Sequence, residues 1–111
     1  MMVLKIDESK LLTDMYSDEY FPNHLVDKVK SILLTACKEI ESQKPKKLEE
    51  LYTITCQATE LINDLQGEFE ESDSEIETVA RDDIVSSFEY IATMYGFTNA
   101  DVEGLVATRD W

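Results

Sequence analysis

Apolar residues recur at helical spacing in three long tracts of the chain, and no tract alternates apolar and polar residues as a strand would. The apolar positions lie three or four residues apart, which places them on one face of a helix with about 3.6 residues per turn. We therefore predict three long helices, over residues 24–42, 47–70 and 75–95. Their apolar faces consist of Leu25, Val26, Val29, Ile32, Leu33, Ala36, Cys37 and Ile40; of Leu48, Leu51, Tyr52, Ile54, Ala58, Ile62, Leu65 and Phe69; and of Ile76, Val79, Ala80, Ile84, Phe88, Ile91, Ala92 and Tyr95.

Residues at the ends of these tracts are typical helix start and stop signals. Asn23 can cap the first long helix, and Pro45 ends it and opens the next one. Ser74 and Glu77 have the spacing of a capping box, in which each side chain accepts a hydrogen bond from a free backbone N–H of the first turn. Gly96 supplies the left-handed residue that commonly follows a helix. The third helix is thus predicted to begin near Ser74 and to end at Gly96.

Two polar residues fall on the apolar side of this third helix. Glu77 projects into the apolar sector and Ser87 lies inside its edge, at about 100° per residue. Glu77 has two readings: a cap that pairs with Arg81 at i+4, or a carboxylate directed into a pocket between helices. Ser72 and Glu75 repeat the capping spacing two residues earlier, so two start points stay open.

Shorter apolar tracts at both ends predict two further helices, over residues 8–16 and 100–107, capped by Asp7 and Asn99. Because the expected connections are short, neighbouring helices should run antiparallel. We predict an all-α, up-and-down helical bundle of three long antiparallel helices with a short helix at each end. The 111 residues suffice for one domain, 1–111, with one core.

The net charge is −14 and it is unevenly distributed. Residues 1–66 carry 12 acidic and 8 basic residues, whereas residues 67–111 carry 12 acidic residues against Arg81 and Arg109. Such a surface repels phosphate backbones and anionic membranes, so we expect neither nucleic acid nor a membrane as partner. A solvated acidic surface, a basic protein partner and divalent cations remain open.

The chain shows no sign of export. Its apolar lead-in, Met1–Ile6, is too short for a secretory leader, and no run of 18 apolar residues occurs. Cys37 and Cys56 are too few for a disulfide framework, and we expect them to be reduced thiols of a cytoplasmic protein. His24, the only histidine, should point to solvent, where it has no second metal ligand and no nucleophile beside it.

Three aromatic residues are candidates for an interaction surface. Tyr20 and Phe21 precede Pro22 in a loop, where they can close the end of the bundle or form a docking site. Trp111 is costly to leave in water, since burying an aromatic ring of its size is worth roughly 2–3 kcal/mol. We expect Trp111 to fold back on the bundle or to enter a neighbouring subunit.

A metal site made of carboxylates is the alternative. Glu68 and Glu71 form a Glu-x-x-Glu element that resembles that of all-α nucleoside-triphosphate pyrophosphatases, in which helix carboxylates hold magnesium. The resemblance implies a second acidic pair on the following helix, for which Glu77 and Asp83 are the candidates, although their spacing departs from that pattern. Convergence of these four carboxylates would indicate a magnesium-dependent nucleotide pyrophosphatase.

Three segments carry a broader resemblance. YFPNHLVDKVK, SEIETVARDDI and MYGFTNADVEGLVATRDW resemble the corresponding segments of a small bacterial protein family whose function is unknown. The likeness spans Leu11–Trp111 and implies an independent small cytoplasmic protein, but it implies no activity, cofactor or site.

The sequence contains no glycine-rich phosphate loop, no paired metal-ligand motif and no Ser/His/Asp set. Our leading hypothesis is therefore a non-enzymatic interaction protein, of the inhibitor or immunity-protein kind, that binds a basic partner without a cofactor, a catalytic residue or a metal. Self-association through Trp111 or through Tyr20 and Phe21 is compatible with it.

Overall fold

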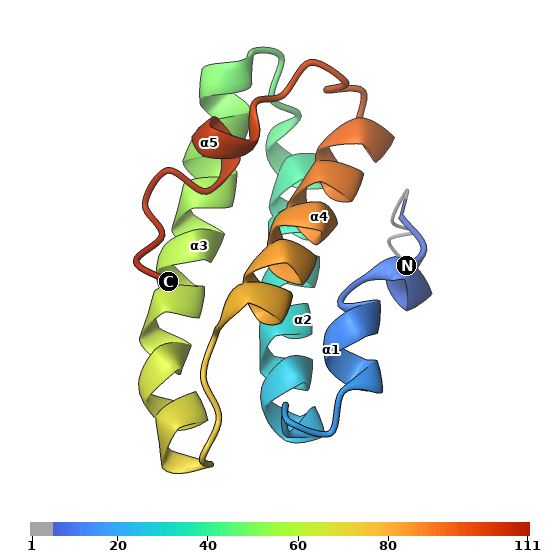
Figure 1. Ribbon diagram of the computed structural model, residues 1–111. Helices are drawn as coiled ribbons and strands as arrows, with labels where there is room; N and C mark the ends of the chain where they lie inside the picture. The colour runs from blue at the N-terminus through green and yellow to red at the C-terminus, as the bar shows by residue number, and fades with distance from the viewer. Residues whose placement is uncertain (1–5) are drawn as a thin grey trace.

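The computed structural model describes residues 6–111, so most of the apolar lead-in Met1–Ile6 lies outside the described residues. Within this part the chain is all-helical and contains no strand, as predicted. Three of the helices are long and pack against each other (Figure 1). The elements are a 3-10 turn η1 at Glu8–Lys10 and the helices α1 at Thr13–Ser17, α2 at Asn23–Gln43, α3 at Leu48–Glu71, α4 at Thr78–Met94 and α5 at Val102–Leu105.

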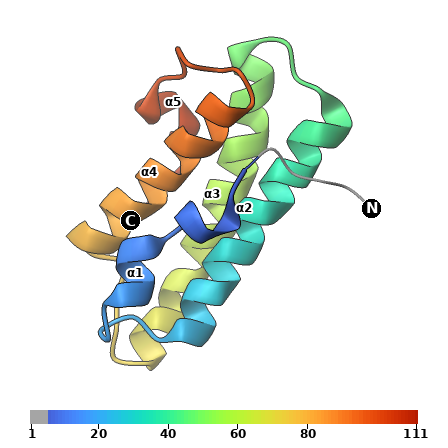
Figure 2. The same ribbon diagram turned by 90° about the vertical axis from the view of Figure 1, so that its right-hand side faces the viewer.

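The helices α2 and α3 lie side by side and form the largest helix–helix contact of the fold. One face of this pair is covered: α4 packs against α2, α1 packs against both α2 and α4, and α5 lies on α3 and α4 (Figure 2). The three long helices and the segments at both ends thereby share one core. Its fully buried large side chains include Leu12, Leu33, Leu51, Ile62, Ile84 and Phe88.

The predicted first helix, 8–16, is corrected by the structure to two short pieces. The chain leaves η1 at Leu11 and turns through Leu12, which has a left-handed φ of 55°, before α1 begins. Both leucines are buried. The break lies in the backbone: Leu11 is extended and Leu12 is left-handed, and the Leu12 N–H donates to Ser87 Oγ at 3.2 Å.

The predicted start of the third long helix is also wrong. α4 begins at Thr78, and its cap is Glu77, whose carboxylate accepts a hydrogen bond from Val79 N at 3.2 Å. Ser74 belongs instead to the end of α3, where its N–H donates to Phe69 O at 2.8 Å. No ion pair joins Glu77 to Arg81 among the described residues.

The helices α3 and α4 end in the same backbone motif. After α3, Asp73 has φ of 56° and donates to Glu70 O; after α4, Gly96 has φ of 90° and Phe97 N donates to Ala92 O at 2.8 Å. These are Schellman motifs, which satisfy the last free carbonyls of a helix. The predicted stop at Gly96 is confirmed, whereas no sequence signal marked Asp73.

The last helix is shorter than the predicted 100–107, and its cap is Asp101 instead of Asn99, with the carboxylate accepting from Glu103 N at 3.0 Å. Beyond it, Asn63 of α3 holds the tail through hydrogen bonds to Thr108 O and from Asp110 N. Trp111 consequently packs against the core, as expected for a tryptophan that folds back on the bundle.

Candidate interaction surfaces

Tyr20 and the α3–α4 turn meet at one end of the molecule. The turn carries Glu70, Glu71, Asp73 and Glu75 on its exposed side and Glu77 at the start of α4. Partial burial, together with the charges of Glu75 and Glu77, raises the pKa of Tyr20. The Tyr20 side chain is nevertheless 42% exposed. We call Tyr20 and the turn 70–77 the acidic end.

Phe21 closes the end of the bundle, which was the alternative to a docking site for this aromatic pair. It is 1% exposed and closes the core, and its ring meets that of Tyr20 edge-on at a centroid distance of 5.0 Å. The buried ring therefore fixes the position of the exposed one. An exposed aromatic face beside carboxylates can receive a lysine or arginine side chain through ion pairs and cation–π contact.

The acidic residues of the second half of the chain are largely uncompensated. Within residues 6–111 the ion pairs are Lys28 with Glu68 and Arg109 with Glu103, the latter at 3.9 Å. Most of the other carboxylates between residues 67 and 111 are exposed. This surplus gives the surface a negative potential that attracts basic proteins and falls with added salt.

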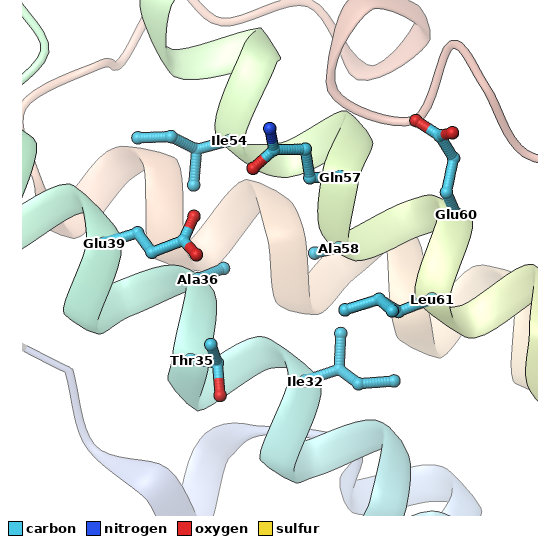
Figure 3. A pocket seen from close by; sticks show the side chains of 9 residues that line it. All are labelled: Ile32, Thr35, Ala36, Glu39, Ile54, Gln57, Ala58, Glu60 and Leu61. Atoms are coloured by element: carbon cyan, nitrogen blue, oxygen red, sulfur yellow. The ribbon is translucent and has the colours of Figure 1, made fainter.

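The second surface is a groove on the uncovered face of the α2–α3 pair. Figure 3 shows it with α4 behind the two helices, and Ile32 of α2 and Leu61 of α3 on its opposite sides. The groove encloses about 240 Å³ and is mainly apolar. Leu61 is 50% exposed there, although leucine is normally a core residue. The other lining residues are Thr35, Ala36, Glu39, Ile54, Gln57, Ala58 and Glu60.

The charged residues that line this groove are both acidic. Glu39 extends toward the groove from α2, and Glu60 stands at its rim on α3 (Figure 3). Lys28 lies on the same two-helix pair but is held by Glu68. The α2–α3 groove thus combines an apolar floor with a negative edge.

A second hollow, of about 250 Å³, lies where α2 and α4 end, and it is lined by both Glu41 and Lys44. Because these two residues carry opposite charges, the hollow favours neither a basic nor an acidic ligand. It differs in this respect from the α2–α3 groove.

The four carboxylates considered for magnesium lie in four different settings. Glu68 pairs with Lys28, Glu71 points to solvent at the end of α3, and Glu77 caps α4. Asp83 is 7% exposed and its Oδ2 accepts from Met15 N at 2.9 Å. In the described part of the chain, no three His, Cys, Asp or Glu side chains are grouped so as to hold a metal ion.

Asp83 and Ser87 together hold the start of α1. Ser87 Oγ accepts from Leu12 N at 3.2 Å, one helical turn from the Asp83 contact with Met15. Burial, followed by the nearby charge of Asp14, raises the pKa of Asp83, against hydrogen bonds that lower it. The position of Ser87 inside the apolar sector was visible in the sequence. No pattern indicated that Asp83 is buried, because its partner is a backbone 68 residues away.

Other candidate residues have simple environments. His24 is exposed, as expected, and Cys37 and Cys56 are free thiols. Burial, and then the charge of Glu41, raises the pKa of Cys37 to about 12, which keeps it a protonated thiol at neutral pH. Trp111 is half-buried, with the Arg109 guanidinium 5.7 Å from its ring centroid.

Comparisons with known proteins add a family but no activity. None of the helices in residues 6–111 has both the length and the apolar character needed to cross a bilayer. No curated protein and no solved structure matches the chain. The model of DUF5713, a family of unknown function, matches residues 5–111, and the chain therefore belongs to that family.

Proposed function

We propose that this protein is a non-enzymatic interaction module that binds a basic protein partner through its acidic surface. The acidic end carries the proposal, because there an exposed aromatic ring is held beside several carboxylates. Such a surface steers a basic partner by its charge and offers the ring as a specific contact. The free cysteines favour a cytoplasmic location.

The proposal keeps the up-and-down antiparallel order of the long helices that the short connections favour. A rigid bundle of this kind presents its surfaces without a large conformational change, as inhibitor-like proteins commonly do. The matched family has no known function, so the support comes from the charge and the geometry of this chain.

The test is affinity capture with the full chain at low and high salt. We expect a basic protein that is retained at low salt and released at high salt. The double variant Glu70→Gln with Glu75→Gln should lose this protein, because both carboxylates are exposed at the acidic end. The matched control, Glu8→Gln with Glu89→Gln, removes two exposed carboxylates elsewhere and should retain it.

The proposal fails if no protein is captured specifically at low salt, or if the two double variants behave alike. Equal losses would mean that total charge alone governs the association. Circular dichroism of both variants checks that their helical content is unchanged.

A further inference from the structure

The α2–α3 groove has the dimensions and the chemistry of a site for one more helix. Its floor is formed by Ala36 and Ala58, whose small side chains let another helix approach closely, between Ile32 on one side and Leu61 on the other. In the part of the chain that the structure describes, no helix covers this face.

The lining residues repeat at helical spacing on both sides. Ile32, Ala36 and Glu39 are positions i, i+4 and i+7 of α2, and Ile54, Ala58 and Leu61 are the same positions of α3. The two ridges run side by side for about 10 Å, or two helical turns. Amphipathic helices bind grooves of this type through apolar residues at i, i+3 or i+4, and i+7.

The charge around the groove indicates whether a second copy of this chain or a basic helix fits it better. Both charged lining residues, Glu39 and Glu60, are acidic. A second copy of this chain would bring another net charge of −14 to the same place, and like charges oppose that association. A helix with lysine or arginine at its flanks gains the opposite interaction.

We propose that the α2–α3 groove binds one amphipathic helix of a partner protein, with apolar side chains against Ile32 and Leu61 and basic side chains beside Glu39 and Glu60. This inference rests on the proposed function, since it names the structural form of the basic partner. It adds a site that lies on a different surface from the acidic end.

The experiment uses the full chain and a fluorescently labelled synthetic helix of about 14 residues, long enough to span the groove. The probe has leucines at i, i+4 and i+7 and lysines at the flanks. Two control peptides have the same composition in scrambled order, or glutamates in place of the lysines. Fluorescence anisotropy should detect binding of the basic amphipathic probe and weaker or no binding of both controls.

Two substitutions of exposed apolar residues locate the bound probe. Leu61→Asp places a carboxylate inside the groove and should weaken binding about tenfold or more. Met94→Asp makes a similar change at a residue that is 41% exposed on α4, outside the groove, and should leave the affinity unchanged. The double variant Glu39→Lys with Glu60→Lys should shift the preference toward the peptide with glutamate flanks.

Three results would overturn the inference. They are equal binding of the scrambled peptide, equal effects of Leu61→Asp and Met94→Asp, and a groove-dependent dimer of the chain itself in sedimentation equilibrium. If the captured partner depends on Glu70 and Glu75 but not on Leu61, the interaction module stands and the groove site fails. If the probe binds the groove while no basic partner is captured, the proposed function fails instead.

Discussion

The two faces of the α2–α3 pair are both apolar, yet in the described part of the chain only one of them is covered by other helices. Ile62 is 0% exposed on the face covered by α4, whereas the preceding residue, Leu61, is 50% exposed in the groove. Consecutive residues of a helix point about 100° apart, so one helix can serve two environments. The comparison separates an apolar side chain that is fully buried in the core from its neighbour, which stays half-exposed.

The acidic residues on the two sides of the molecule also differ, although the buried one, Asp83, belongs to the covering helix α4 and not to the α2–α3 pair. On the covered side Asp83 lies in the interior, where its charge is offset by backbone N–H groups. On the open side Glu39 and Glu60 stand around an apolar floor in contact with water. A buried carboxylate has to be satisfied within the fold, while an exposed one is free to meet an external base.

The largest expected effect comes from substituting the two neighbouring residues that define the comparison. Ile62→Ala should lower the free energy of unfolding by about 2–5 kcal/mol, because it leaves a cavity in the core. Leu61→Ala should change it by no more than about 0.5 kcal/mol. Urea denaturation followed by circular dichroism measures both. A large loss for Leu61→Ala would show that the open face also belongs to the core.

The next prediction concerns the buried carboxylate of the covered side. Asp83→Ala leaves Met15 N–H without its acceptor and should cost about 1–3 kcal/mol of unfolding free energy. Asp83→Asn keeps an oxygen acceptor and removes the buried charge, so its stability at neutral pH should equal or exceed that of the wild type.

The pH dependence of the stability tests whether the pKa of Asp83 is raised in the folded state. Because the folded-state pKa of Asp83 is raised above its ordinary value of 3.8, the native state holds the proton more tightly than the unfolded state. Stability relative to Asp83→Asn should therefore be highest below pH 3.8 and should fall as the pH rises through the raised pKa. Thermal unfolding of both proteins across this range measures the difference. A wild type that gains stability over Asp83→Asn with rising pH would contradict the assignment.

A pair of glycines tests how tightly α5 covers the fold. A Cβ added at Gly104 would lie 2.7 Å from the ring of Tyr52, so Gly104→Ala should cost about 1–3 kcal/mol of stability. Gly67 in α3 has no atom within 4 Å of the same position, and Gly67→Ala should stabilise the protein by about 0.5–1 kcal/mol. Differential scanning calorimetry of the two variants measures whether each change raises or lowers the stability. If both variants changed the stability in the same direction, the close approach of α5 to α3 would be refuted.

The sequence was sufficient for features that depend on local order. Periodic apolar residues predicted the all-helical class, and Gly96 marked the end of α4 because its left-handed conformation is a property of the residue itself. Burial of Trp111, on the bundle or in a neighbouring subunit, could be predicted because the cost of exposing it does not depend on the contacts that bury it. Its packing on the bundle itself is known only from the structure.

Features that depend on distant contacts could not be predicted. For Glu77 the prediction was right in part: of the two interpretations, the cap is confirmed, but Glu77 is itself the N-cap of a helix that begins later, and no ion pair joins it to Arg81 among the described residues. The burial of Asp83 requires the unpaired N–H groups at the start of α1. The α2–α3 groove requires knowledge of which helix face stays uncovered, so Leu61 carried no signal in a single sequence.

A further small effect separates backbone strain from charge at the acidic end, while both faces of the α2–α3 pair stay unchanged. Asp73 adopts φ of 56°, a conformation that favours glycine, so Asp73→Gly should stabilise the protein by about 0.5–1 kcal/mol. Asp73→Ser is the matched control, because it removes the same charge but keeps a Cβ at this left-handed position, without the preference of asparagine for that conformation. If both variants gain equally in urea denaturation, relief of charge repulsion is the cause; if only Asp73→Gly gains, the left-handed turn stores the strain. If Asp73→Gly gains stability and still captures the salt-sensitive partner protein, the remaining acidic side chains, and not Asp73, contact that partner.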